Sequence, residues 1–192
     1  MIPAPVLLLP TGVGEAKPLI HDSINHLLAR WLPDRKEVMF SGNESGHGFR
    51  LYVESPEQGK PRPISPEGVN PFFVVSPKGD FAATVGPDHK IYRYPVAGGE
   101  PLLVSGTEPD EAPTGWSGDG RFLYVFRFGE IPSKVVELEL STGKRKLWKE
   151  LVPADAAGID TIRGITITPD AKAYVYGYIR TLSDLYVVEG LK

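Results

Sequence analysis

Trp116-Ser-Gly-Asp-Gly-Arg-Phe-Leu-Tyr-Val125 joins the end of one apolar stretch to a second one through a tight turn of Ser, Gly and Asp. The same arrangement occurs three more times in the 192 residues, as Trp31-Leu-Pro-Asp-Arg-Lys-Glu-Val-Met-Phe40, Val75-Ser-Pro-Lys-Gly-Asp-Phe-Ala-Ala-Thr84 and Ile167-Thr-Pro-Asp-Ala-Lys-Ala-Tyr-Val-Tyr176. The turn anchors Pro33, Pro77, Gly118 and Pro169 lie 44, 41 and 51 residues apart. Those intervals straddle the roughly 40–45 residues of a four-stranded propeller blade. The repeat therefore predicts an all-β fold, a β-propeller array of four blades.

A second repeated element follows each of these segments. Aromatic and β-branched runs, typical of strands, occur at Leu51-Tyr-Val53, Ile91-Tyr-Arg-Tyr94, Val135-Val-Glu-Leu138 and Leu185-Tyr-Val-Val188. Three of them lead into a glycine turn and a fourth strand, where glycine supplies the positive φ of a tight hairpin. We therefore expect four blades of four-stranded antiparallel sheets, at residues 21–66, 67–106, 107–151 and 152–192.

The two ends of the chain are out of phase with this repeat. Residues 6–20 match a third strand, a Thr-Gly turn and a fourth strand, whereas the last repeat stops where its own fourth strand should begin. We therefore expect residues 1–20 to complete the last blade, with Glu15–Ile20 paired to Asp184–Val188. Two geometries satisfy this pairing: a four-bladed ring closed within one chain, or two chains joined head to tail into an eight-bladed ring. The inner strands carry bulky side chains that would crowd a narrow ring, which favours the homodimer through terminal strands; these residues are Trp31, Phe72, Phe73 and Trp116.

Composition excludes several classes of protein. The formal net charge is −3 and the longest basic run is Lys144-Arg145-Lys146, so the surface lacks the dense positive charge that nucleic acid requires. The chain contains no cysteine and therefore no disulfide, thiol nucleophile or Cys-ligated zinc. The apolar run Val6–Leu9 is too short to span a membrane, so no direct membrane contact is expected.

The turn sequences resemble a known family. Ser-Pro-Lys-Gly-Asp80, Trp-Ser-Gly-Asp-Gly-Arg121 and Thr-Pro-Asp-Ala-Lys172 are similar to the Ser-Pro-Asp-Gly-Lys turn of TolB-like propeller repeats, also called PD40 or WD40-like repeats. Trp31-Leu-Pro-Asp34, Gly98-Gly-Glu-Pro101 and the ending Leu182–Leu191 resemble the C-terminal propellers of bacterial receptor-like serine/threonine kinases. The resemblance implies a sensor region that is extracytoplasmic in such a receptor. Two repeats depart from the pattern, because Arg35 and Ala171 replace the turn glycine, which leaves the turn type open.

Catalytic motifs are missing from the chain. There is no Gly-rich nucleotide loop with a strand lysine, no His-Arg-Asp and no Asp-Phe-Gly. Gly115-Trp-Ser-Gly-Asp119 misses the nucleophile elbow Gly-x-Ser-x-Gly at its last position, so Ser117 is interpreted as a turn residue. The four histidines lack metal-ligand spacing. We expect no catalytic residue, no bound metal and no cofactor.

Loops before the inner strands hold the candidate binding residues. In a propeller these loops would meet at one mouth of the channel, so the alignment of the repeats predicts a ligand-binding rim formed by His26, Asn70, Asp110, Glu111, Asp160 and Arg163. Solvated loop charge is the alternative interpretation of the acidic members. Trp31 and Trp116 hold matching positions, for which packing between blades is a better explanation than ligand stacking.

These features favour a recognition or sensor module that binds a protein, a peptide or a small polar ligand at the channel mouth. The alternative is an enzyme with its site in the channel, or the propeller domain of a hydrolase such as a peptidase. Propeller fold and function are only loosely coupled, so the sequence does not identify the ligand.

Overall fold

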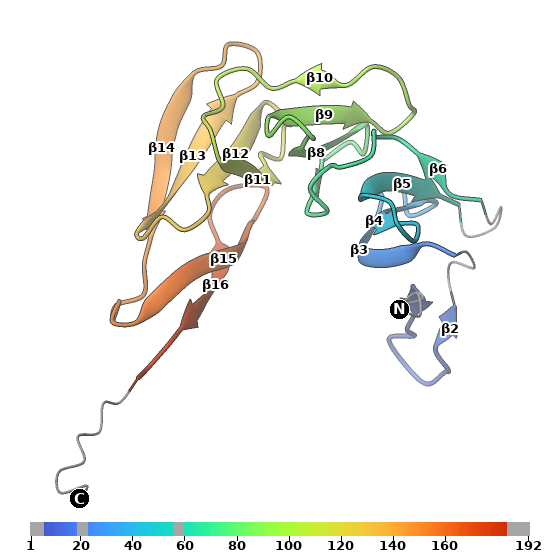
Figure 1. Ribbon diagram of the computed structural model, residues 1–192, viewed down its shortest axis with the longest axis horizontal. Helices are drawn as coiled ribbons and strands as arrows, with labels where there is room; N and C mark the ends of the chain where they lie inside the picture. The colour runs from blue at the N-terminus through green and yellow to red at the C-terminus, as the bar shows by residue number, and fades with distance from the viewer. Residues whose placement is uncertain (1–5, 19–22, 56–59, 184–192) are drawn as a thin grey trace, which may run out of the picture.

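A computed structural model describes residues 6–18, 23–55 and 60–183 of the chain (Figure 1). These residues form antiparallel strands and no helix, so none of the described segments is a helix that could cross a membrane. The strands of the first blade are β3 (Asn25–Trp31), β4 (Val38–Asn43), β5 (Arg50–Glu54) and β6 (Arg62–Pro63). Those of the second are β7 (Val74–Val75), β8 (Phe81–Val85), β9 (Ile91–Pro95) and β10 (Leu102–Leu103).

The third blade is also complete. Its strands are β11 (Glu111–Trp116), β12 (Phe122–Arg127), β13 (Ser133–Glu139) and β14 (Arg145–Leu151). In each of these three sheets the strands are paired in the order of the sequence. The fourth blade has two described strands, β15 (Ile159–Ile167) and β16 (Tyr174–Arg180). The all-β, four-stranded antiparallel architecture expected from the repeat is confirmed.

The blades follow one another along an arch, with β11 and β15 near its concave side and β14 outermost (Figure 1). The N-terminal hairpin pairs β1 (Leu7–Leu8) with β2 (Lys17–Pro18) and lies beside the first blade, at the opposite end of the arch from β15 and β16 (Figure 1). The hairpin expected over residues 6–20 is therefore present in its described part, residues 6–18. Its predicted pairing with Asp184–Val188 falls outside the described residues.

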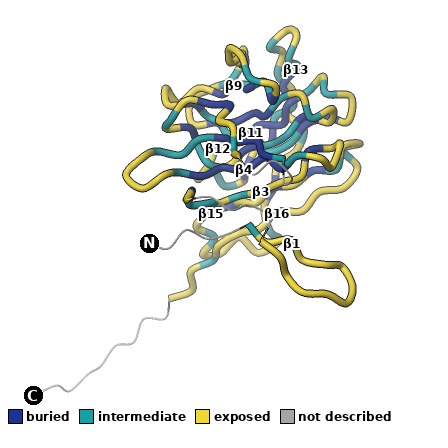
Figure 2. Tube along the Cα trace, turned by 90° about the vertical axis from the view of Figure 1, so that its right-hand side faces the viewer, coloured by how far each residue is buried: buried dark blue, intermediate teal, exposed yellow. Residues whose placement is uncertain are grey.

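The core lies between blades rather than within them. Side chains alternate across each strand, so the middle strands face both neighbours. On β12, for example, Leu123 and Val125 belong to the core shared with the second blade, whereas Tyr124 and Phe126 belong to the core shared with the fourth. A further core joins the first and second blades around Met39. Buried residues are concentrated in this stack, while the N-terminal hairpin is exposed (Figure 2).

Trp116 and Trp31 behave differently despite their matching positions. Trp116 is 7% exposed, and its indole Nε1 donates to the Val74 carbonyl of the preceding blade at 3.3 Å. Its interpretation as an inter-blade packing residue is confirmed. Trp31 is 44% exposed, because the position before the first blade holds only the hairpin among the described residues. The packing interpretation is therefore wrong for Trp31 within this part of the chain.

Candidate functional site

The six predicted rim residues lie at or near the starts of inner strands, but most of them already contact other residues of their own blade. Asn70 accepts a hydrogen bond from the Phe72 amide at 2.9 Å, and Asp160 accepts one from the Thr181 hydroxyl. The His26 ring packs edge-on against Phe40, with 4.7 Å between ring centroids. These contacts hold local structure and leave little freedom to bind a ligand.

Glu111 is the most constrained of the predicted rim residues. It is buried, and its carboxylate takes two hydrogen bonds from the Arg145 guanidinium, at 2.6 and 2.9 Å. The same carboxylate accepts the Glu108 amide at 2.8 Å, and the pair raises the pKa of Arg145. Bidentate pairing of this kind is strong and geometrically specific. Glu111 therefore fastens the start of β14 to the loop before β11.

Asp110, Asp160 and Arg163 are the three rim residues that remain exposed. No hydrogen bond or ion pair between described residues links any two of the six. Nor does the described part of the chain contain three His, Asp or Glu side chains placed to hold a metal ion. The six residues come from four different blades, and their convergence on one mouth of a channel stays a prediction.

A hollow of about 490 Å³ lies at the other end of the inner strands, between the third and fourth blades. The third blade lines it with residues of its first turn and of two strands, and the fourth blade with its equivalent turn. The lining residues are Ser117, Gly118, Asp119, Phe122, Tyr124, Glu137, Pro169, Asp170 and Ala171.

Two equivalent turns supply the carboxylates of this hollow. In the third blade, Asp119 Oδ1 accepts the Ser117 hydroxyl at 2.6 Å and the Arg121 amide at 3.0 Å. In the fourth, Asp170 Oδ1 likewise accepts the Thr168 hydroxyl at 2.6 Å and the Lys172 amide at 3.2 Å. Such side-chain hydrogen bonds to the backbone define Asx-type turns. They favour the charged form and lower the pKa of both carboxyls, with the hydroxyl bond as the main cause.

Close backbone contact holds the two turns together. The Gly118 amide donates to the Pro169 carbonyl at 2.8 Å, which ties the third blade to the fourth. A Cβ at Gly118 would meet that carbonyl oxygen at 3.2 Å, closer than most Cβ contacts. The glycine therefore permits the approach of the two blades that sets the width of the hollow.

The wall of the hollow comes from the middle strands of the third blade. Tyr124 and Glu137 stand directly opposite each other on β12 and β13, and the phenol donates to Glu137 Oε2 at 3.2 Å. Burial, with the charge of Glu137 as the next cause, raises the pKa of Tyr124 to about 12. The phenol thus stays protonated at neutral pH. Beyond it, Trp148 lies 5.6 Å from the Tyr124 ring and contacts Tyr174 edge-on.

The hollow combines carboxylate oxygens with aromatic faces. This pairing suits a cationic side chain, since a guanidinium or ammonium group is attracted to both. Ser117 is less suited to act as a nucleophile, because its hydroxyl donates to Asp119 and accepts the Phe122 amide at 3.0 Å.

The sequence pointed to these turns as a fold signature and not as a site. A usable signal existed for Asp119 and Asp170, because Ser/Thr-x-Asp occupies equivalent positions in two adjacent repeats. Glu137 and Tyr124 carried no such signal. Their contact depends on the register of β12 against β13, which the sequence pattern does not specify.

Comparison with known proteins places the fold among propellers. TolB from Acinetobacter baumannii matches with a TM-score of 0.65 at 14% identity, over 91% of this chain and 48% of that chain. A putative TolB from Agrobacterium tumefaciens matches with a TM-score of 0.59 at 19% identity, over 86% of this chain and 62% of that chain. Oligogalacturonate lyase from Vibrio parahaemolyticus matches with a TM-score of 0.63 at 12% identity, over 92% of this chain and 53% of that chain.

No protein-family model and no curated protein matches the sequence. The chain spans about half to three fifths of the length of these three solved structures. At these identities the likeness shows the fold alone, and the neighbours include both an enzyme and non-enzymes. The described blades thus have the fold of β-propeller proteins such as TolB, in line with the resemblance of the turn sequences.

Proposed function

We propose that the chain is a non-catalytic recognition module that binds a positively charged segment of a protein or peptide in the hollow between the third and fourth blades. The observation that carries this proposal is the pair of equivalent turns, which present Asp119 and Asp170 to one opening. In each, Oδ1 is used by the turn, while Oδ2 has a loose ion pair, 4.0 Å to Arg121 and 3.9 Å to Lys172. These second oxygens are available to an incoming cation.

An aromatic ring adds a second source of attraction. Phe122 lines the same hollow, and the Arg121 guanidinium lies 5.3 Å from its ring centroid, so this ring attracts a guanidinium and an incoming arginine would compete with Arg121 for it. Arginine therefore fits the site better than a small inorganic cation. The negative net charge of −3 further favours the approach of a basic partner.

The sequence resemblance extends the proposal to a biological setting. In a longer protein, a module of this kind would serve as the sensor region of a bacterial receptor-like serine/threonine kinase. It would then lie outside the cytoplasm and report the binding of its partner to the kinase. Expression of that longer protein, with kinase activity measured with and without a bound basic peptide, tests this part of the proposal.

The binding proposal itself can be tested with two probes. Acetyl-Gly-Arg-Gly-Arg-Gly-amide is the basic probe, and the same peptide with Glu in place of both Arg is the acidic one. Surface plasmon resonance should show at least about tenfold tighter binding of the basic peptide. Asp119→Asn and Asp170→Asn should each weaken that binding about threefold to fivefold, because an exposed ion pair contributes up to about 1 kcal/mol.

Asp88→Asn is the matched control. Asp88 is an exposed turn carboxylate of the second blade, where it accepts the Tyr92 hydroxyl at 2.9 Å, so this variant removes the same charge outside the hollow. Its binding should stay within about twofold of the wild type. The pKa of both site carboxyls is lowered, so binding should persist at pH 5 and be lost only at more acidic pH, as they protonate. Equal binding of the acidic peptide, or an equal loss in Asp88→Asn, would refute the proposal.

A further inference from the structure

The arch ends in two faces that have no complete neighbouring blade among the described residues. At the first blade, Ile24, Val38, Phe40 and Tyr52 form a small buried cluster, and Val6 of the N-terminal segment packs against it. The segment thus occupies the place of a preceding blade. It covers that face only in part, because Leu27 and Trp31 of β3 remain exposed.

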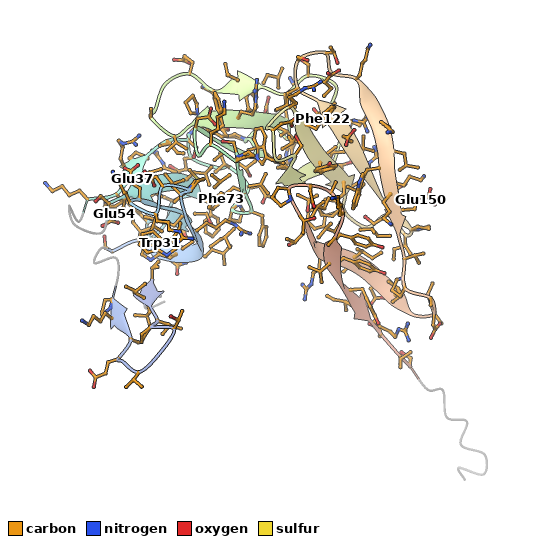
Figure 3. The ribbon with its side chains drawn as sticks, turned by 180° about the vertical axis from the view of Figure 1, so that it is seen from behind. Trp31, Glu37, Glu54, Phe73, Phe122 and Glu150 are labelled. Carbon is orange, nitrogen blue, oxygen red and sulfur yellow. The ribbon has the colours of Figure 1, made fainter. Side chains whose placement is uncertain are left out.

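Trp31 shows what this face lacks. Its equivalent Trp116 is buried against β7 of the blade before it, where the indole meets the Val74 carbonyl. Trp31 lies on the first blade, on the side of the N-terminal hairpin (Figure 3), with 44% of its surface exposed. Because Trp116 contacts the inner strand of the blade before it, the repeat predicts that Trp31 contacts the inner strand of a blade placed before the first blade.

The face at the other end of the arch is exposed in the same way. On β16, Tyr174 and Tyr176 face the third blade, because both contact or join its core. Val175 and Ile179 alternate with them and face outward. Val175 is 64% exposed, whereas its equivalent in the third blade, Tyr124, is 2% exposed beneath the fourth blade.

The two ends carry complementary parts of a blade. The hairpin β1–β2 corresponds by the repeat to third and fourth strands, while β15 and β16 are first and second strands. The repeat assigns the third strand of the last blade to Leu185–Val188, outside the described residues, so what this blade needs from the hairpin is its fourth strand. Within the described residues, the arch keeps the two ends of one copy apart (Figure 1).

We propose that the partner of both end faces is a second copy of the chain. The β15–β16 end of each copy packs against the first blade of the other, next to the β1–β2 hairpin. Val175 and Ile179 of one copy then cover Leu27 and Trp31 of its partner, and the two-fold axis repeats the junction on the opposite side. The rotation between the copies is a half-turn, so the second junction forms between the same two molecules and the assembly closes as a pair; a head-to-tail contact with a rotation that does not close would extend into a filament.

Light scattering coupled to gel filtration tests the pairing. The wild-type chain should give about twice its mass of 21.0 kDa and dissociate on dilution. Val175→Glu and Trp31→Glu place a charge in the junction and should each raise the dissociation constant at least about tenfold. Leu147→Glu is the matched control, because Leu147 is an exposed strand residue of the third blade, away from both ends. This variant should remain dimeric.

Mixing the two variants tests the geometry. A copy with Trp31→Glu keeps an intact β16 end, and a copy with Val175→Glu keeps an intact first blade. An equimolar mixture therefore has one unaltered junction and should regain dimer that neither variant forms alone. Circular dichroism of each variant checks that its strand content is unchanged.

A wild-type chain that is monomeric at all concentrations would overturn the proposal and leave both faces to another polypeptide. Dimers that survive both variants, or a mixture that regains nothing, would also overturn it. The peptide-binding experiment uses residues outside these faces, so either proposal can fail while the other stands.

Discussion

Trp31 and Trp116 illustrate how one residue type at one repeat position can have two environments. Both end an inner strand and both precede the same turn, so the sequence alone assigns them the same role. Only the presence of a complete preceding blade separates them. Trp116 has one and is 7% exposed, while Trp31 is 44% exposed.

This difference predicts unequal costs of truncation. Trp116→Ala should lower the free energy of unfolding by about 3–5 kcal/mol, because it empties a packed site between two blades. Trp31→Ala should cost about half as much when the chain is dilute enough to be monomeric, because nearly half of the side chain already contacts water. Urea denaturation of the two variants measures the difference. Equal costs would show that Trp31 is covered in solution to the same degree as Trp116.

Glu111 marks the limit of prediction at the residue scale. The repeat alignment correctly places it at the start of an inner strand, yet its buried pairing with Arg145 joins residues 34 positions apart. The sequence does not distinguish a loop carboxylate that faces solvent from one that pairs with an arginine distant in the chain. Asp110, one residue earlier, is exposed.

The turn between the first and second strands of a blade has one geometry in all four repeats. Gly79 and Gly120 have φ angles of 76° and 72°. Arg35 and Ala171, which replace this glycine in the first and fourth repeats, have φ angles of 58° and 56°. In every case the backbone amide at this position donates to the carbonyl three residues earlier, at 2.8–2.9 Å. Replacement of the glycine therefore changes the local strain and not the turn type.

Exchanging the residues at these positions should shift stability in opposite directions. Ala171→Gly should raise the free energy of unfolding by about 0.5–1 kcal/mol, because a Cβ is disfavoured at positive φ. Gly79→Ala should lower it by about 1–2 kcal/mol or more, since the new Cβ would also lie 2.8 Å from Pro33 Cδ. Chemical denaturation of both variants checks this. Destabilisation by Ala171→Gly would mean that the left-handed backbone there is not retained.

Strand existence was predictable at the element scale, and strand register was not. The repeat located the first two strands of every blade because apolar runs and turn residues are local signals. The hollow depends instead on Tyr124 facing Glu137 and on Gly118 approaching Pro169. The first contact is set by strand register and the second by the packing of two blades. Neither register nor blade packing is specified by a short sequence motif.

The whole molecule combines a predictable repeat with an arrangement that the repeat does not fix. A blade cannot bury both of its faces alone, so repeats of this period must stack, and the cores between blades follow from that requirement. The number of blades that a ring needs is not encoded in any one blade. The open arch, with its two exposed end faces, is therefore a property that only the structure displays (Figure 1).

The location of binding on this arch distinguishes the hollow from the rim at the opposite end of the inner strands. Nuclear magnetic resonance of the ¹⁵N-labelled chain, titrated with the basic peptide acetyl-Gly-Arg-Gly-Arg-Gly-amide, measures it directly. We expect the backbone amides of Gly118, Asp119 and Ala171 to shift first and to saturate together, while those of Asn70 and Glu111 stay unchanged. Shifts concentrated at Asn70 and Glu111, or spread evenly over the four blades, would contradict this expectation.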